Sequence, residues 1–268
     1  MTGTGAGESK GYRSERLSSF RRTVIASASV THEKNTIHTL AAVDITEPRR
    51  LMAEHVEATG EKPSLTAYVV TCLAHVLRDH PRLNSFVKGR RQVFLDDVTV
   101  SVLVERELAG EKVPEPLAVR RAQSKSFPEI QREIRDAQRE QDEKLGSLSG
   151  HTYVRFVPGF LLKTFVRVMD RNIRIARAYG KVAVTAVGMY SGEPFWFVPH
   201  GSATVLVSVG SIGRKVVEVD GRLESREHLH LTLSFDHDIV DGAPAARFTD
   251  QFLTAVKSGQ LLRAESEG

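Results

Sequence analysis

The sequence predicts an α/β fold, an α+β two-layer sandwich in which helices pack on a mixed β-sheet. Strand-like and helix-like segments alternate irregularly along the 268 residues, which favours a mixed sheet over a regular βαβ repeat. Several segments alternate apolar and polar residues, as strands with one buried face do, and no internal repeat or linker is visible. We expect one domain over residues 16–262, with a Gly-, Ser- and Thr-rich tail over residues 1–15 and a short tail over 263–268.

The composition is typical of a soluble globular protein, with 41% hydrophobic and 26% charged residues. No apolar run approaches the roughly 20 residues of a membrane span, and the first residues lack the apolar core of a secretory signal. Cys72 is the single cysteine, which excludes an internal disulfide. These observations predict a cytoplasmic protein. The net charge of +4 suits an anionic substrate or surface and does not by itself indicate nucleic acid.

The N-terminal third predicts a basic helix beginning near Arg16, a strand over residues 36–45 and two further helices. Thr46 is expected to cap the first of these, and Ser64 the second. Cys72 lies within the second helix among apolar residues and is expected to serve packing. The apolar positions of that helix fall on one stripe, so we expect it to pack on a core: Leu65, Val69, Leu73, Val76 and Leu77.

The middle third begins with a strand pair that turns at Lys88-Gly89, followed by a strand over residues 97–105. Pro114 and Pro116 are expected to interrupt regular structure after it. Ser126 and Pro128 then open a long charged helix, which Gly146 closes.

Residues 158–179 predict one amphipathic helix with an apolar and a largely basic stripe. A basic stripe can lie on a membrane surface or an acidic partner, but more often it is solvated. The apolar stripe holds Leu162, Phe165, Met169, Ile173 and Ala176; the opposite one holds Lys163, Arg167, Asp170, Arg174 and Arg177. Strands are expected next over residues 182–187, 203–212 and 215–220, the last turning at Asp220-Gly221.

Residues 229–242 read LHLTLSFDHDIVDG and are the stretch around which we expect the site to form. Apolar and polar residues alternate up to Asp236, which predicts a strand. The pattern breaks at His237, reaches Asp241-Gly242 and passes into an amphipathic helix. An imidazole at the end of a buried strand, with an Asp-Gly turn four residues on, is suited to a fixed general base. We expect Gly242 to allow a φ that other residues resist.

The longer string SFDHDIVDGAPAARF resembles the HxxxDG signature of the 2-oxoacid dehydrogenase acyltransferases, the dihydrolipoyl acyltransferase cores of those complexes. It also resembles chloramphenicol acetyltransferase, which shares their fold. The similarity extends over roughly residues 16–260 and includes RRTVIAS, HPRLN and VAVTAVGMYS. The resemblance implies a chloramphenicol acetyltransferase-like mixed sheet with helices packed on it.

The resemblance also implies roles for individual residues. His237 would be the general base, and Thr185, aligned on Gly188-Met189, would donate to the oxyanion; the two are 237 − 185 = 52 residues apart. Asp241 would hold the loop through a salt bridge to an early arginine, Arg21 or Arg22. Simpler alternatives are a plain strand threonine for Thr185 and a helix N-cap for Asp241.

The family transfers an acyl group directly between coenzyme A and an acceptor, without an acyl-enzyme. The expected substrates are an acyl-CoA and a thiol, hydroxyl or amine acceptor, either a small molecule or a lipoyl carrier; no lipoate is expected to be attached to this chain. Relatives form trimers with the histidine and the hydroxyl from neighbouring subunits, so we expect a homotrimer or a multiple of it. No metal is expected, because His228 and His230 have no evident third ligand. Nucleic-acid partners are not expected.

Three departures from the family pattern affect the interpretation. Asp238 stands where the family usually has arginine, the 158–179 segment is longer than the corresponding connection, and no N-terminal lipoyl domain is visible. The polar strand face of His230, Thr232 and Ser234 suits an interface, a channel or solvent. The alternative function is a non-catalytic trimeric scaffold, or a protein that binds a membrane or partner through residues 158–179.

Overall fold

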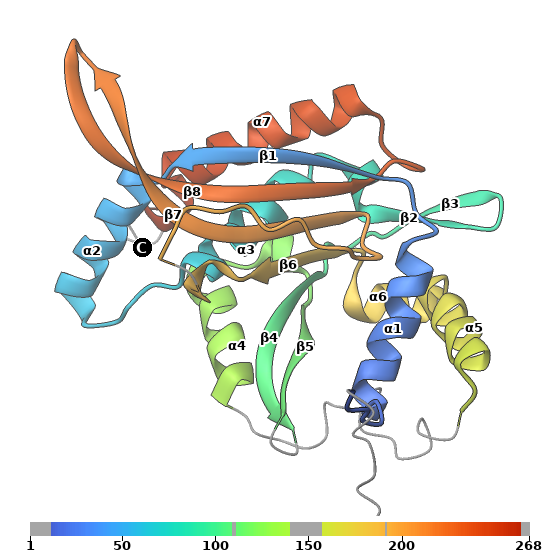
Figure 1. The fold of residues 1–268 in the computed structure, drawn as a ribbon. Helices are drawn as coiled ribbons and strands as arrows, with labels where there is room; N and C mark the ends of the chain where they lie inside the picture. The colour runs from blue at the N-terminus through green and yellow to red at the C-terminus, as the bar shows by residue number, and fades with distance from the viewer. Residues whose placement is uncertain (1–11, 109–110, 140–156, 191, 264–268) are drawn as a thin grey trace, which may run out of the picture.

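A computed structural model describes residues 12–108, 111–139, 157–190 and 192–263. Its main sheet has six strands in the order β1-β8-β7-β6-β4-β5, and β2 and β3 form a separate hairpin (Figure 1). β6 pairs in parallel with β4 and with β7, and the other pairs are antiparallel. The strands are β1 (Thr36–Asp44), β2 (Ser85–Lys88), β3 (Arg91–Phe94), β4 (Val100–Leu108), β5 (Glu111–Val119), β6 (Val182–Ala186), β7 (Val205–Val219) and β8 (Arg222–Asp236).

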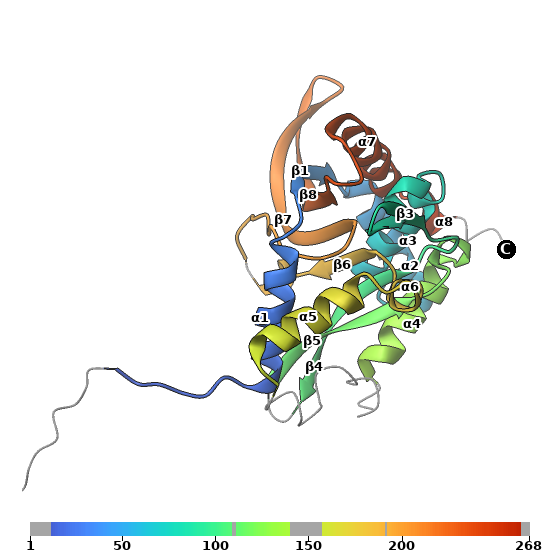
Figure 2. The ribbon, with the colours of Figure 1, turned by 90° about the vertical axis from the view of Figure 1, so that its right-hand side faces the viewer.

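α3, α4 and α7 form a layer on one side of this sheet, and α1 lies on the other side (Figure 2). They are α1 (Ser19–Thr31), α2 (Thr46–Thr59), α3 (Leu65–Leu77), α4 (Phe127–Arg139), α5 (Gly159–Asp170), α6 (Ile173–Tyr179), α7 (Gly242–Ser258) and α8 (Gln260–Arg263). The prediction of a mixed sheet with helices packed on it is confirmed.

The core lies between the sheet and α3 and α7. Alternate residues of β7 and β8 project into it, and Leu231, Leu233 and Phe235 are completely buried. Tyr68 joins the two helices, because its hydroxyl donates to the Val256 carbonyl at 2.8 Å. Cys72 is also fully buried, which confirms its packing role, and burial raises the pKa of its thiol to about 12. Such a thiol is not a nucleophile at neutral pH.

Two expectations about the strands were wrong. β5 continues through Pro114 and Pro116, because it is an edge strand and a missing N–H on its outer side costs no ladder hydrogen bond. Residues 205–219 form one strand where two were predicted, and a register shift between Val209 and Ile212 absorbs the irregularity. The predicted turn between β7 and β8 is confirmed, with positive φ at both Asp220 and Gly221.

The predicted single helix over residues 158–179 is also wrong. It is two helices, α5 and α6, broken at Arg171, with the Asn172 side chain capping α6. Asp170 ends α5, and its side chain is 12% exposed and paired with Lys181 rather than part of a solvated stripe. Two half-buried basic residues of α5, Lys163 and Arg167, pair with Glu33 beyond the end of α1. Part of the basic stripe therefore faces the protein's own chain.

Helix ends follow the predictions in part. The Ser64 hydroxyl accepts from the Ala67 N–H, as expected of an N-cap. Thr46, by contrast, is the first residue of α2, and Ile45 is its N-cap residue. α4 ends at Arg139, and the predicted stop at Gly146 lies outside the described residues. In the part of the chain that the structure covers, no helix is both long and apolar enough to cross a bilayer.

Candidate active site

The turn that carries His237 spans residues 236–241, between the end of β8 and the start of α7; we call it the His237 turn. Ile239 and Val240 are buried and fix it to the core. Their N–H groups both donate to the Asp236 carbonyl, at 3.0 and 3.1 Å. His237 itself is exposed, and no described residue makes a hydrogen bond or ion pair with its imidazole. The ring is therefore free to contact a substrate.

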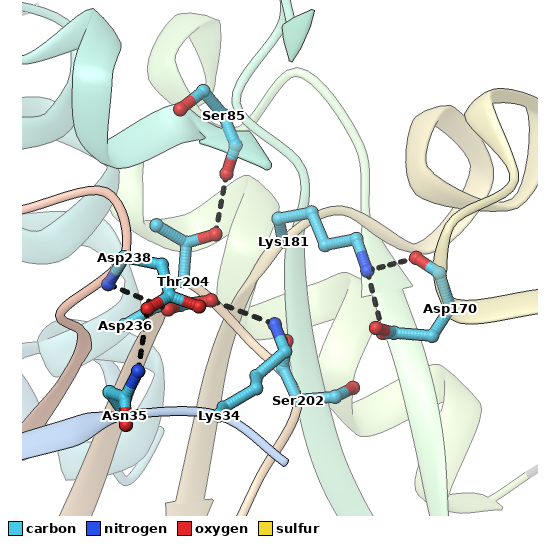
Figure 3. A network of polar contacts seen from close by, with 9 residues as sticks. All are labelled: Lys34, Asn35, Ser85, Asp170, Lys181, Ser202, Thr204, Asp236 and Asp238. Atoms are coloured by element: carbon cyan, nitrogen blue, oxygen red, sulfur yellow. Dashed lines mark hydrogen bonds and ion pairs between the residues drawn. The ribbon is translucent and has the colours of Figure 1, made fainter. Parts of the chain in front are cut away.

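A network of polar contacts joins the His237 turn to the segment before β1 (Figure 3). Asp236 is 4% exposed, and its carboxylate accepts from the Lys34 ammonium at 2.9 Å and from the Asp238 N–H at 3.2 Å. The His237 N–H donates to the Asn35 carbonyl at 2.6 Å. The backbone on both sides of the imidazole is thus fixed by the segment that precedes β1.

Sequence reasoning missed Lys34, Asn35 and Asp236. These contacts join residues about 200 positions apart, so no local pattern reveals them. The one available signal was a carboxylate at the end of an otherwise buried strand, which requires a charge partner. Asp238, which stands where the family usually has arginine, accepts from the Asn35 side-chain amide at 2.8 Å.

Asp241 is at the N-cap position of α7, but its side chain accepts no hydrogen bond from the first turn. Within the described residues it has no ion pair with Arg21 or Arg22. The Arg22 guanidinium donates to the Val157 carbonyl. The salt bridge therefore stays a prediction, and it would have to form in another arrangement of the side chains or between subunits.

The expected reason for Gly242 is wrong. It is the first residue of α7 and is not among the residues with positive φ. A Cβ added there would meet no atom within 4 Å. In a single chain, nothing about the backbone or the packing requires glycine at this position.

Thr185 lies on β6 and is 8% exposed, and no described residue bonds its hydroxyl. It pairs with Ser208 on β7, which pairs with Thr232 on β8, so three hydroxyls form a row across the sheet. The Ser208 and Thr232 hydroxyls are buried without partners. Beyond β6, Gly188 lies against the Gly210 carbonyl, so close that no side chain would fit there.

His237 and Thr185 do not meet within one chain. Thr185 is two strands from Thr232, and Thr232 precedes His237 by 237 − 232 = 5 residues. At about 4.8 Å between strands and 3.3 Å per residue, their Cα atoms are separated by roughly 15–20 Å. A general base must lie within about 3 Å of the proton that it abstracts. The two side chains of one chain therefore cannot contact the same reacting group of a substrate.

A second ion pair, between Lys181 and Asp170, lies near the pair of Lys34 and Asp236. The Lys181 ammonium donates to the Asp170 carboxylate at 2.8 Å and lies 5.1 Å from the centre of the Phe86 ring. Burial lowers the pKa of Lys181, and Asp170 opposes that shift. For Asp170, burial acts to raise the pKa, but Lys181 and Lys34 outweigh it and the net shift is downward. We take both groups as charged, because each ion has its partner within hydrogen-bond distance.

The polar face of β8 is not open to solvent, which rules out one of the predicted alternatives. His230, Thr232 and Ser234 are all at most 3% exposed. Trp196, from the segment before β7, packs edge-on against the His230 ring. Among the described residues, no cluster of three or more histidine, cysteine or acidic side chains is placed to bind a metal.

Comparison with known families gives a match over most of the chain. The model of the 2-oxoacid dehydrogenases acyltransferase (catalytic domain) matches residues 9–153 and 177–263. Residues 154–176, which include α5, are not matched. Both His237 and Thr185 lie within the matched part.

Similar curated proteins include the dihydrolipoyllysine-residue acetyltransferase component of the pyruvate dehydrogenase complex from Bacillus subtilis, 26% identical over 94% of this chain. The corresponding component from Corynebacterium glutamicum is 28% identical over 85% of the chain. This chain spans 52% of the first relative and 30% of the second, so it corresponds to about half or less of their length.

Solved structures agree on the fold. A probable dihydrolipoamide acetyltransferase from Listeria monocytogenes has a TM-score of 0.69 at 19% identity, covering 93% of this chain and 96% of its own. The cubic core of a pyruvate dehydrogenase multienzyme complex has a TM-score of 0.71 at 16% identity, with 98% of each chain covered. At these identities the likeness establishes the fold and nothing further.

Proposed function

Because the chain belongs to the 2-oxoacid dehydrogenase acyltransferase (catalytic domain) family, we propose that it is an acyltransferase that takes its acyl group from coenzyme A. The acceptor is a thiol, hydroxyl or amine. The observation that carries the proposal is the His237 turn: an exposed imidazole that no described residue bonds, on a backbone fixed by buried contacts. Such a group can receive a proton without moving.

The reaction needs two functional groups from the protein. The His237 imidazole takes the proton of the acceptor as the acceptor attacks the thioester carbonyl. The carbonyl oxygen becomes negatively charged, and the Thr185 hydroxyl donates a hydrogen bond to it. Collapse of this intermediate restores the carbonyl and breaks the carbon–sulfur bond, and the departing sulfur takes the proton back from His237. The products are the acylated acceptor and coenzyme A.

The proposal includes a homotrimer, or a multiple of one, with each site shared by two subunits. The separation of His237 from Thr185 supports this arrangement, since a neighbouring subunit would have to supply one of them. Shared sites arise naturally in closed rings of identical subunits. The protein would act in the cytoplasm, and its acceptor is either a dihydrolipoyl group on a separate protein or a small molecule.

A non-catalytic scaffold is the alternative. It would use α5 and α6 to bind a membrane or another protein. The structure gives it little support, because Lys163 and Arg167 are already paired with Glu33. Asp238, in place of the family's usual arginine, is the feature of the His237 turn that favours a decayed site, whereas His237, Asp241 and Gly242 are all present.

Release of coenzyme A thiol tests the proposal. The purified protein would be given a panel of acyl-CoAs with dihydrolipoamide, a small alcohol or a small amine. Acceptor-dependent release is expected, and His237→Ala should lower it by roughly 10²–10⁴-fold. His75→Ala, at an exposed position on α3, is the matched control and should keep full activity. Equal turnover by His237→Ala and the wild type would contradict the assignment of the base.

A further inference from the structure

A large cavity lies beside Thr185. Its volume is about 790 Å³, within the range of small-molecule sites. Its walls come from α1, α5 and α6, from strands β4, β5, β6 and β7, and from the segment before β7. Most of the side chains that line it are apolar. Two carbons, as in an acetyl group, would leave nearly all of this space empty.

The outer wall of the cavity is the part of the chain that the family model does not match. Five apolar side chains of this wall come from α5, within the unmatched residues 154–176, and Asp170 is a sixth residue from the same helix: the five are Leu161, Leu162, Phe165, Val166 and Met169. Three more residues come from α6: Ile175 and Ala176, which are also unmatched, and Tyr179, which is matched. The outer wall of the cavity therefore lies largely outside the family match, while its inner wall lies within it.

The inner wall includes the expected oxyanion donor. Thr185 lines the cavity, and so does Ala183, two residues earlier on the same strand. Residues two apart on a strand share a face, so the small Ala183 side chain leaves room next to the Thr185 hydroxyl. An acyl carbonyl bound to that hydroxyl would direct its carbon chain into the cavity.

The charges in the wall are already neutralised. Lys181 and Asp170 both line the cavity, but they pair with each other at 2.8 Å. Neither is available to bind a charged end of a substrate, such as the second carboxylate of a dicarboxylic acyl group. An apolar chain is the ligand that this lining favours.

We propose that the cavity binds the carbon chain of the acyl group, so that the protein transfers apolar acyl groups larger than acetyl. This inference rests on the proposed function, because it places the acyl carbonyl at Thr185. α5 and α6 then select the substrate, while the matched part of the chain performs the chemistry.

The test compares octanoyl-CoA with acetyl-CoA as donors, measured as the ratio of their kcat/KM values. The wild type should favour octanoyl-CoA. Ala183→Leu places a larger side chain beside Thr185, and it should lower the ratio by at least about tenfold, since each buried methylene contributes about fourfold. Leu161→Trp, at a half-exposed position on α5, narrows the cavity from the other side and serves if Ala183→Leu does not fold. Ala178→Leu, on α6 but outside the cavity lining, is the matched control and should leave the ratio unchanged.

Binding separates this inference from the proposed function. If neither the wild type nor any variant turns over an acyl-CoA, the proposed function fails. Calorimetry with the same two ligands still shows whether the cavity binds the acyl chain. Tighter binding of octanoyl-CoA, weakened selectively by Ala183→Leu, would support the cavity as a chain site. An unchanged ratio in both assays would overturn the inference. A change in oligomeric state with an unchanged ratio would also overturn it, and would identify the cavity as a subunit contact.

Discussion

The His237 turn and the cavity beside Thr185 differ in the side chains that form them. Buried polar contacts from Lys34, Asn35 and Asp236 fix the turn, whereas apolar side chains form most of the cavity wall. The turn lies entirely within the residues that the family model matches, and the α5 wall lies outside them. The family match therefore covers the residues that hold the base but not the α5 wall, where we propose that the acyl group is selected.

The largest expected effect concerns Thr185. Thr185→Val removes only the hydroxyl, which no described residue bonds, so stability should hardly change. Loss of an oxyanion donor typically lowers the rate by about 10²–10³-fold. Thr232→Val is the matched control, because its hydroxyl is in the same row, buried and without a partner. Steady-state kinetics of both variants measures the loss of rate, and thermal unfolding measures the change in stability. Equal rates for the two variants would remove Thr185 from the site.

The next effect tests the framework of the His237 turn. Lys34→Met leaves the Asp236 carboxylate buried without its cation, and the two side chains are 16% and 5% exposed. Breaking such a pair should lower the free energy of unfolding by about 3 kcal/mol. Lys163→Met breaks the pair with Glu33, whose side chains are 39% and 37% exposed, and should cost under about 1 kcal/mol. Urea unfolding compares them, and similar losses would show that the turn does not depend on Lys34.

A smaller effect is expected from acid at the cavity. Burial acts to raise the pKa of Asp170, but Lys181 and Lys34 lower it by more. The pKa therefore lies below its ordinary value of 3.8. A lowered carboxyl pKa stabilises the folded state above the ordinary value, and this stability is lost as the pH falls through the folded-state pKa. Urea unfolding at pH values from 6 down to 3 should show a decline that is shallower in Asp170→Asn. The same slope in both proteins would contradict this role.

Gly242→Ala should have the smallest effect on a single chain. Space surrounds the position and its φ is ordinary, so the free energy of unfolding should change by less than about 0.5 kcal/mol. If activity nevertheless falls, the glycine is needed by the substrate or by the assembled site. A large loss of stability would contradict the open environment seen here.

Much of this fold could be predicted from local patterns. Alternation over residues 229–236 identified the end of β8, and the break at His237 located the turn. Prolines 114 and 116 were misleading because the edge position of β5 depends on the order of strands, which no local pattern encodes. The break between α5 and α6 had a local signal, since asparagine is a strong N-cap residue, but the apolar stripe outweighed it.

The candidate site was only partly predictable. His237 and Thr185 lie in motifs, whereas Lys34 and Asn35 act through contacts with residues about 200 positions away. The cavity depends on how α5 and α6 pack against β4 and β6, which the sequence periodicity does not describe. Sequence motifs thus identified the candidate catalytic residues, whereas the contacts and the cavity around them depend on tertiary packing.

The most direct test of a shared site is complementation between two inactive variants. His237→Ala and Thr185→Val would be produced alone and as co-expressed mixed assemblies purified through different tags. If each site takes His237 from one subunit and Thr185 from its neighbour, every trimer that holds both variants keeps one intact site in three. The account predicts that the mixed assemblies recover about that fraction of wild-type turnover. No recovery in mixed assemblies of wild-type size would contradict it, because both residues would then have to act from the same chain.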